Sequence, residues 1–117
     1  MFTALIPTVF YDDLDVGLDL FRDGIGLAEL HRETDFVVLG KEHAKVYLRQ
    51  NSELAALDRP EFGLETDTID AVYADISGRR PDLLHPNLDR VTPRPWGARE
   101  FAVLDATTVC VVFRDWS

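Results

Sequence analysis

Apolar positions along the first half of this chain follow two different periods, one typical of a helix and one typical of strands. Leu14, Leu18 and Phe21 recur at the spacing of a helix face, and Asp12 or Asp13 is placed to cap that helix. Runs of alternating residues, which predict strands, follow at 27–31, 35–39 and 44–49. A further strand is expected ahead of the helix, so the first half is predicted to be β-α-β-β-β.

The strand ahead of the helix is predicted at 3–9 and contains Pro7. Proline has no backbone N–H for a sheet ladder, so we expect an edge strand or a strand exchanged with another chain. Gly24 and Gly26 are expected to end the helix, because glycine readily adopts the left-handed backbone of helix ends. Residues 51–60 are expected to be a connector with one helical turn.

The same order of elements then begins again. A strand is predicted at 61–66, and a second helix is expected with Asp67 as its cap and Gly78 as its end. Its apolar face is formed by Ile69, Val72, Tyr73 and Ile76. A short strand is predicted near 89–92 and leads to the last part of the chain.

Two apolar runs near the end of the chain predict a β-hairpin. They cover 100–104 and 109–113, separated by a short polar break. Trp96 and Gly97 lie just ahead of the first run, so a bulky aromatic residue is expected at the mouth of the hairpin.

The two halves are related by an internal repeat. The first helix aligns with the second at an offset of 55, since Leu14 matches Ile69. The strand at 35–39 aligns with 100–104 at an offset of 65, so the additional residues fall in the loop before the hairpin. One four-stranded sheet with one helix buries only one face well. Two such units are therefore expected to pack side by side, within one chain or between chains.

The composition is that of a globular protein with an acidic surface. The 117 residues carry 12 Lys and Arg against 21 Asp and Glu, a formal net charge of −9. Such a charge repels nucleic acid and anionic lipid and attracts cationic ligands, and no apolar run is long enough to cross a membrane. Cys110 is the only cysteine and is expected to be a small buried hydrophobe. We expect a cytoplasmic protein without nucleic-acid or membrane partners.

No catalytic motif is apparent in the sequence. His31, His43 and His85 lack the spacing of paired metal ligands and are expected in or beside turns. The chain has neither a phosphate-binding glycine loop nor a Gly-x-Ser-x-Gly nucleophile elbow.

Two β-α-β-β-β modules of this length, with two short motifs, resemble the glyoxalase/bleomycin resistance protein/dioxygenase (vicinal oxygen chelate) superfamily, and its bleomycin-resistance-like branch in particular. The motifs are Asp-Asp-Leu-Asp at 12–15 and Pro-Trp-Gly-x-Arg-Glu-Phe at 95–101. The resemblance implies a single α+β domain over 1–117, with module one at about 1–57 and module two at about 58–117. It also implies incurved mixed sheets that form a cleft, and a homodimer that exchanges its N-terminal strands.

Enzymes of this superfamily hold a divalent metal with side chains from the first and last strands of each module. Carried over by position, those places fall near Ile6, Tyr47, Glu61 and Val112. Only Glu61 is a competent ligand for a hard divalent cation, and one ligand of four does not retain an ion. These positions therefore predict no metal site. With no other catalytic motif in the sequence, no cofactor and no catalytic residue are expected.

A binding protein of this family needs aromatic surface for stacking and acids for a cationic guest. On the family's pattern Trp96 lies at the mouth of the cleft, and the period of two along strands adds side chains to the same face. Eight residues are expected to line the cleft: Trp96, Gly97, Phe36, Tyr47, Glu61, Gly63, Glu65 and Arg49. Core packing is the alternative for each aromatic residue, and an ion pair with Arg49 or Arg99 is the alternative for Glu61.

These expectations lead to the hypothesis of a metal-independent binding protein of the bleomycin-resistance type. It would sequester a cationic, partly aromatic antibiotic or metabolite in a dimer-interface cleft, with stacking on Trp96 and positive groups held by Glu61 and Glu65. The alternative is a metal-dependent glyoxalase- or dioxygenase-like enzyme with an irregular site built from Glu61 and His43 or His85. A third possibility is that the cleft serves an unrelated metabolite.

Overall fold

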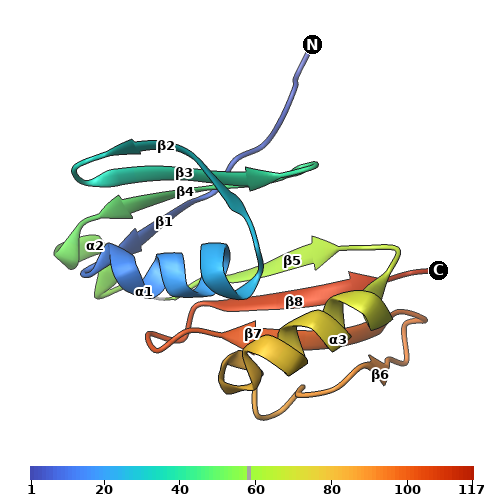
Figure 1. Cartoon of the computed structure of the whole chain (residues 1–117). Coiled ribbons are helices and arrows are strands. Elements are labelled where there is room, and N and C mark those ends of the chain that lie inside the picture. Colours follow the sequence, from blue (N-terminus) through green and yellow to red (C-terminus); the bar gives the residue numbers. More distant parts are fainter. Residues whose placement is uncertain (58) are drawn as a thin grey trace. The chain divides into compact units, whose positions relative to one another are not determined.

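The computed structural model, shown in Figure 1, describes residues 1–57 and 59–117. The chain divides into two compact units, Met1–Asp58 and Arg59–Ser117. Each unit contains one four-stranded sheet of parallel and antiparallel strands together with its own helices. The predicted α+β class, with a mixed sheet in each half, is confirmed. That the two units make one domain, and that two chains exchange strands, remain predictions.

The first unit has the predicted order of elements. These are β1 (Thr8–Tyr11), α1 (Leu14–Leu18), its π-helical continuation η1 (Asp19–Gly24), β2 (Ala28–Glu33), β3 (Phe36–Lys41), β4 (Ala44–Gln50) and α2 (Ser52–Ala55). The sheet order is β1-β4-β3-β2, with β1 parallel to β4. Asp13 caps α1 as predicted, and α2 is the single turn expected in the connector. The helix ends at Gly24, and Gly26 has the left-handed φ of +96° that this ending requires.

The second unit repeats this plan. Its elements are β5 (Glu61–Glu65), α3 (Ile69–Arg79), a 3₁₀ turn η2 (Pro81–Leu83), β6 (Thr92–Pro93), β7 (Arg99–Leu104) and β8 (Cys110–Asp115). The sheet order is β5-β8-β7-β6, with β5 parallel to β8 and the β7–β8 hairpin antiparallel, as the sequence predicts.

The strand registers agree with the internal repeat for the first and last strands of each unit, which are β1 and β4 in the first unit and β5 and β8 in the second. Thr8 lies opposite Tyr47 in the first sheet, and Gly63 lies opposite Val112 in the second. The first strands are therefore offset by 55 (63 − 8) and the last strands by 65 (112 − 47), as predicted.

The strand before the final turn is displaced by one residue from the prediction. Phe36 lies opposite Arg49 in the first hairpin, and Glu100 lies opposite Arg114 in the second. Because β4 and β8 are offset by 65 (114 − 49), Phe36 and Glu100 correspond, at an offset of 64 (100 − 36). The predicted pairing of Phe36 with Phe101 is therefore wrong by one position.

The displacement arises in the loop between β7 and β8. The first hairpin turns through two residues between Lys41 and Ala44, whereas the second turns through three between Asp105 and Val109. The Asp105 carboxylate accepts hydrogen bonds from the backbone N–H groups of Thr107 (2.7 Å) and Val109 (3.1 Å). These bonds stabilise the longer loop, and the extra residue shifts β7 relative to β8.

One face of the second sheet packs against α3. Phe101 and Phe113 stack with their centroids 4.7 Å apart, and Tyr73 of α3 meets Phe101 edge-on at 5.1 Å. Ile69 and Ile76 of α3 are completely buried, and Figure 1 shows this helix lying along the sheet. Because side chains alternate along strands, the residues between these core positions point to the opposite face.

The first sheet is packed in the same way against α1. Val37, Leu39 and Leu48 are fully buried on the side that also holds the ring of Tyr11. Tyr11 lies directly against Gly17 of α1, where a Cβ atom would be 2.5 Å from a ring carbon. The absence of a side chain at Gly17 therefore allows the helix to approach the sheet.

The first strand begins later than predicted. It covers Thr8–Tyr11 rather than 3–9, so Pro7 precedes the strand instead of lying within it. The carbonyl of Pro7 accepts a hydrogen bond from the N–H of Tyr47 (3.0 Å), but the proline nitrogen cannot continue the ladder. The apolar residues ahead of it that are fully exposed are Met1, Phe2 and Leu5.

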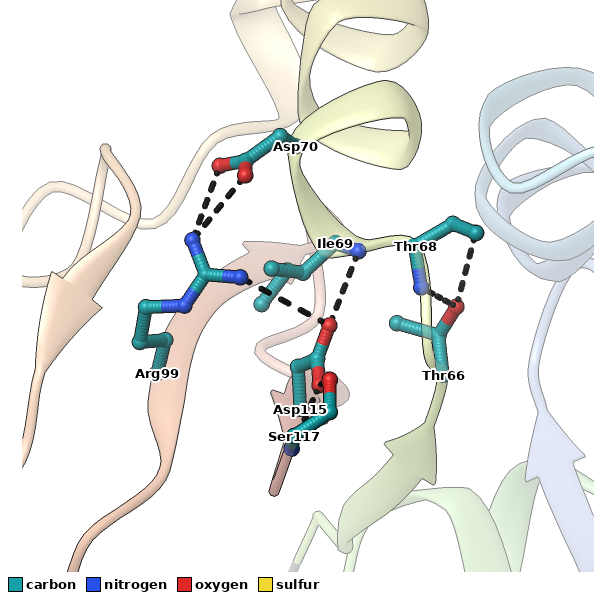
Figure 2. Close-up of polar contacts among 7 residues, drawn as sticks. All are labelled: Thr66, Thr68, Ile69, Asp70, Arg99, Asp115 and Ser117. Carbon is teal, nitrogen blue, oxygen red and sulfur yellow. Dashed lines mark hydrogen bonds and ion pairs between the residues drawn. The ribbon is translucent and has the colours of Figure 1, made fainter.

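The prediction that Asp67 caps α3 is wrong, because the cap comes from a residue distant in sequence. The buried carboxylate of Asp115, at the end of β8, accepts a hydrogen bond from the N–H of Ile69 at 3.3 Å (Figure 2). Arg99 lies 3.8 Å from the same oxygen and also bonds to Asp70 at 3.0 Å. The start of α3 is thus tied to both strands of the hairpin.

Two further boundaries differ from the prediction. Helix α3 continues past Gly78 to Arg79, which forms an ion pair with Asp75 one turn earlier (2.7 Å). The short strand expected near 89–92 is confined to Thr92–Pro93.

Within the described residues, no helix has the length and hydrophobicity that a membrane crossing requires.

The packing at Gly17 predicts opposite outcomes for two glycine-to-alanine changes. Gly17→Ala should lower the free energy of unfolding by roughly 1–3 kcal/mol, because the new methyl group meets the buried ring of Tyr11. Gly78→Ala in α3, with no atom within 4 Å of the added Cβ, should raise it by about 0.5 kcal/mol. Urea denaturation of both variants measures the difference, and equal midpoints would contradict the assigned packing.

The cap on α3 predicts that Asp115→Ala lowers the melting temperature by about 5 °C at pH 7, whereas Asp67→Ala leaves it unchanged. Hydrogen bonds from Ser117, together with those from Ile69 and the charge of Arg99, lower the pKa of Asp115. Because the pKa of Asp115 is lowered in the folded state, its carboxylate stabilises the fold at pH values above its ordinary pKa near 4. This stabilisation is lost as the pH falls below that value and the carboxylate is protonated. The difference between wild type and Asp115→Ala should therefore narrow below about pH 4 in thermal melts.

Candidate functional site

The second sheet has one face that α3 does not cover, which we call the face opposite α3. It is formed by alternate residues of three strands: Glu61, Gly63, Glu65, Glu100, Ala102, Leu104, Cys110, Val112 and Arg114. Cross-strand neighbours form rows on this face. Glu65, Arg114 and Glu100 make a charged row, and Gly63, Val112 and Ala102 make an uncharged row beside it. The strand period thus combines charged and apolar surface on one side of the sheet.

Trp96 lies beside the charged row with its ring half exposed and its N–H group held. The indole nitrogen donates to Glu100 at 2.9 Å, and 51% of the residue remains exposed. The guanidinium carbon of Arg94 lies 4.7 Å from the ring centroid. Gly97 follows with a φ of +98° and donates its N–H to the Arg94 carbonyl (2.9 Å), so glycine is needed for this turn. The indole is therefore a fixed aromatic surface that a ligand can stack on.

Glu100 is a buried acid that organises the charged row. Its carboxylate accepts hydrogen bonds from the Trp96 indole and from Arg114, the latter at 2.6 Å. The Nε atom of Arg94 lies 3.7 Å from the other carboxylate oxygen. Burial raises the pKa of Glu100, but the hydrogen bonds from Arg114 and Trp96 outweigh it, and the net pKa lies below the ordinary value. Glu100 is therefore ionised at neutral pH and already compensated by the protein's own donors.

Trp116 is held on the same face in a similar way. Its indole nitrogen donates to Glu65 at 2.5 Å, and 55% of the residue is exposed. Both tryptophans of the chain thus have their N–H groups bonded to carboxylates of the charged row. Glu65 is predicted from sequence to hold a positive group of the ligand, and in the structure its carboxylate also orients the indole of Trp116.

A hollow of about 210 Å³ lies on the face opposite α3. Its apolar lining is Leu88, Ala102, Cys110 and Val112, and its polar lining is Glu61, His85, Asn87 and Arg94. Burial and the nearby charge of Glu61 raise the pKa of the Cys110 thiol to about 11. The thiol is therefore protonated at neutral pH and unreactive, and the prediction of a buried, hydrophobe-like cysteine is confirmed.

The first unit has an aromatic cluster on the face opposite α1. Phe36 meets Tyr47 edge-on with 5.4 Å between centroids, and the guanidinium carbon of Arg49 lies 4.6 Å from the Phe36 ring. His31 approaches Phe36 at 6.3 Å and lies 3.0 Å from Glu33. A separate hollow of about 420 Å³ in this unit lies beside the β3–β4 turn and is lined by Ile6 and His43, among others.

The structure brings the eight predicted residues together in two groups, one in each unit. The group in the first unit is Phe36, Tyr47 and Arg49. The group in the second unit is Trp96, Gly97, Glu61, Gly63 and Glu65. The strand period correctly places Glu61, Gly63 and Glu65 on one face. That these residues bind a ligand remains a prediction.

The alternatives left open by the sequence are partly decided. Phe101 is a core residue, whereas Trp96 is not buried. Glu61 forms no ion pair with Arg99, which pairs with Asp70 and Asp115, and within the described part of the second unit it has no hydrogen-bond partner. Its carboxylate is therefore available to a ligand.

Several residues of this surface were missed from sequence. They are Arg94, Glu100, Arg114, Trp116 and Asn87, whereas His85 was considered only as a ligand of an irregular metal site. Glu100 carried one usable signal, because it is part of the Pro-Trp-Gly-x-Arg-Glu-Phe motif, whereas Arg114 lies at the end of β8 beside another charged residue. Asn87 carried none, since it lies on a loop whose path depends on contacts with β7.

The metal that related enzymes hold does not fit the residues present. Of the four corresponding positions only Glu61 offers a suitable oxygen, and Ile6 lies outside β1 altogether. Across residues 1–57 and 59–117, no group of three or more His, Cys, Asp and Glu is arranged to hold an ion.

No family model matches the sequence, and no curated protein matches it. The fold, however, is similar to several solved structures. The bleomycin-binding protein of Streptomyces verticillus, solved with copper(II)-bleomycin, matches with a TM-score of 0.75 over 97% of this chain and 95% of its own, at 19% identity. The glyoxalase/bleomycin resistance protein/dioxygenase of Alicyclobacillus acidocaldarius matches with a TM-score of 0.74 over 97% and 90%, at 15% identity.

A lactoylglutathione lyase of Agrobacterium tumefaciens matches with a TM-score of 0.72 over 97% of this chain and 93% of its own, at 17% identity. Binding proteins and enzymes thus share this backbone, so the likeness alone does not distinguish between them. The chain has the fold that these bleomycin-binding and glyoxalase-type proteins share, as its repeat and its Trp-Gly motif predict.

Proposed function

We propose that this chain is a metal-independent binding protein of the bleomycin-resistance type, which sequesters a cationic, partly aromatic small molecule and releases it unchanged. The observation that carries the proposal is Trp96, a half-exposed indole whose N–H is fixed by a buried carboxylate. A ring held in this way loses little conformational freedom when a flat guest stacks on it.

The charge on the face opposite α3 supports a positively charged guest. Glu61 has no partner within the described residues, and the chain as a whole carries −9. Glu65 contributes through Trp116, and its second oxygen can accept a further hydrogen bond from a guest. Gly63 adds no side chain to the surface between the two acids.

A homodimer is part of the proposal. The apolar side chains of Phe2 and Leu5, in the segment ahead of β1, are fully exposed in a single chain. Exposed apolar residues grouped in this way are typical of a surface that another molecule covers. The aromatic cluster around Phe36 would supply the guest's second contact surface in such an assembly.

Titration with bleomycin should quench tryptophan emission saturably, and chromatography should recover the compound unchanged. Trp96→Ala should weaken binding by tenfold or more, on the order of 1.4 kcal/mol, because the stacking surface is removed. Leu57→Ala, which changes an exposed apolar residue and keeps both tryptophans, serves as the matched control. Absence of a saturable change with bleomycin and with a panel of cationic antibiotics would exclude this ligand class.

A metal-dependent enzyme is the second candidate, and one observation favours it: Glu61 and His85 line the same hollow. Two ligands with a protonated thiol beside them are too few for tight binding of a divalent ion. Metal analysis of protein purified without chelator should therefore find far less than one ion per chain. About one tightly held ion per chain would overturn the metal-independent function.

A further inference from the structure

We propose that the hollow on the face opposite α3 binds a small zwitterion, with Arg94 holding its carboxylate and Glu61 its ammonium group. The proposal names a ligand class for the face that the proposed function uses, and in that respect rests on it. It assigns to Arg94, His85 and Asn87 a part in recognition that neither the sequence motifs nor the likeness in fold provides.

Arg94 is an incompletely satisfied cation in the lining of the hollow. Its Nε atom is buried and has no hydrogen-bond partner within the described residues. The nearest carboxylate oxygen, on Glu100, lies 3.7 Å away and is beyond hydrogen-bonding distance. Trp96 lies against the guanidinium group, which limits its movement. A buried donor without a partner is costly, so an oxygen supplied by a ligand carboxylate would be bound favourably.

Glu61 supplies the opposite charge. It lies on β5 opposite Cys110, and its charge reaches the thiol in the lining of the hollow. No hydrogen bond or ion pair engages its carboxylate within residues 1–57 and 59–117, in contrast to Glu65 and Glu100 on the same face. A ligand ammonium group would therefore meet an acid that nothing else compensates.

His85 and Asn87 add neutral donors to the lining of the hollow. The backbone N–H of Asn87 donates to Nδ1 of His85 at 3.0 Å, which assigns the proton of the neutral ring to Nε2. The Nε2–H group and the Asn87 amide are then available to a ligand carboxylate. The apolar lining of Leu88, Ala102 and Val112 suits the hydrocarbon body of such a ligand.

The size of the hollow restricts the ligand further. Its volume of about 210 Å³ equals that of about seven waters at roughly 30 Å³ each, and lies below the roughly 300–1,000 Å³ typical of drug-sized sites. It therefore suits a molecule of amino-acid size, or the end of a larger guest that carries both an amine and an acid.

Three probes with one common body test the proposal: phenylalanine, which carries both charges, 3-phenylpropionate, which keeps only the carboxylate, and phenethylamine, which keeps only the ammonium group. Binding is followed by NMR on ¹⁵N-labelled protein through the amides of Ala102, Cys110 and Val112. Phenylalanine should bind at least tenfold more tightly than either analogue, with saturable shifts at these amides.

Two charge-removing variants distinguish the two ends of the hollow. Arg94→Gln should weaken the binding of phenylalanine and phenylpropionate about tenfold and leave that of phenethylamine unchanged. Glu61→Gln should weaken the binding of phenylalanine and phenethylamine about tenfold and leave that of phenylpropionate unchanged. Arg90→Gln is the matched control, since the Arg90 side chain is largely exposed and pairs with the adjacent Asp89. Equal binding of the three probes, equal losses of phenylpropionate and of phenethylamine in both variants, or no binding at all would overturn the zwitterion proposal.

The outcome is separable from that of the bleomycin titration. Bleomycin binding that depends on Trp96, without discrimination among the probes, would leave the proposed function standing and remove the zwitterion assignment. Probe binding that depends on Arg94 and Glu61, without any response to cationic antibiotics, would keep the assignment and exclude the antibiotic class.

Discussion

Strand β8 pairs with β5 in parallel and with β7 in antiparallel orientation. The alternation of side chains along β8 determines which residues of the second unit lie on each face of its sheet. Val111 and Phe113 point toward α3 and are buried, whereas Val112 and Arg114 point to the other face. Since a shift of one residue would exchange the two sets, this register decides which residues pack against α3 and which lie on the opposite face. The first sheet follows the same rule with α1, so each unit has one face that its own helix does not cover.

Glu100 shows how this uncovered face obtains fixed geometry. A buried carboxylate is costly by itself, and its ion pair with Arg114 is not evidence of extra stability, since desolvation offsets much of the attraction. The hydrogen bond to Trp96 indicates a different role, because it orients an indole that is half exposed. Gly97 completes this arrangement through a backbone conformation that other residues rarely adopt.

The two modules have used the same backbone positions for different chemistry. Phe36 and Arg49 are cross-strand neighbours joined by a cation–π contact, and their counterparts Glu100 and Arg114 are joined by a hydrogen-bonded ion pair. The arginine is common to both, and only its partner differs. Such divergence within one chain supplies an aromatic surface from one unit and a charged surface from the other, without any change in the sheet.

Local patterns in the sequence were sufficient for the element order, the repeat and the face of β5 that carries Glu61, Gly63 and Glu65. These features depend on periods of two and 3.6 residues and on nearby caps, which short stretches of sequence contain. The same information supplied the resemblance in fold, because the order and length of elements follow from it. The Trp-Gly turn was also local, since glycine alone readily permits its backbone.

Only the tertiary structure decided the contacts between residues distant in sequence. The cap on α3 comes from Asp115, 46 positions beyond Ile69, and no local pattern indicates a partner so far away. The one-residue displacement of β7 depends on how the Asp105 loop closes, and it makes Glu100 rather than Phe101 the counterpart of Phe36. Likewise, Arg94 and Glu61 line one hollow because cross-strand pairing and loop packing bring them together. The hydrophobic periodicity of the sequence does not indicate which residues distant in sequence lie close together in space.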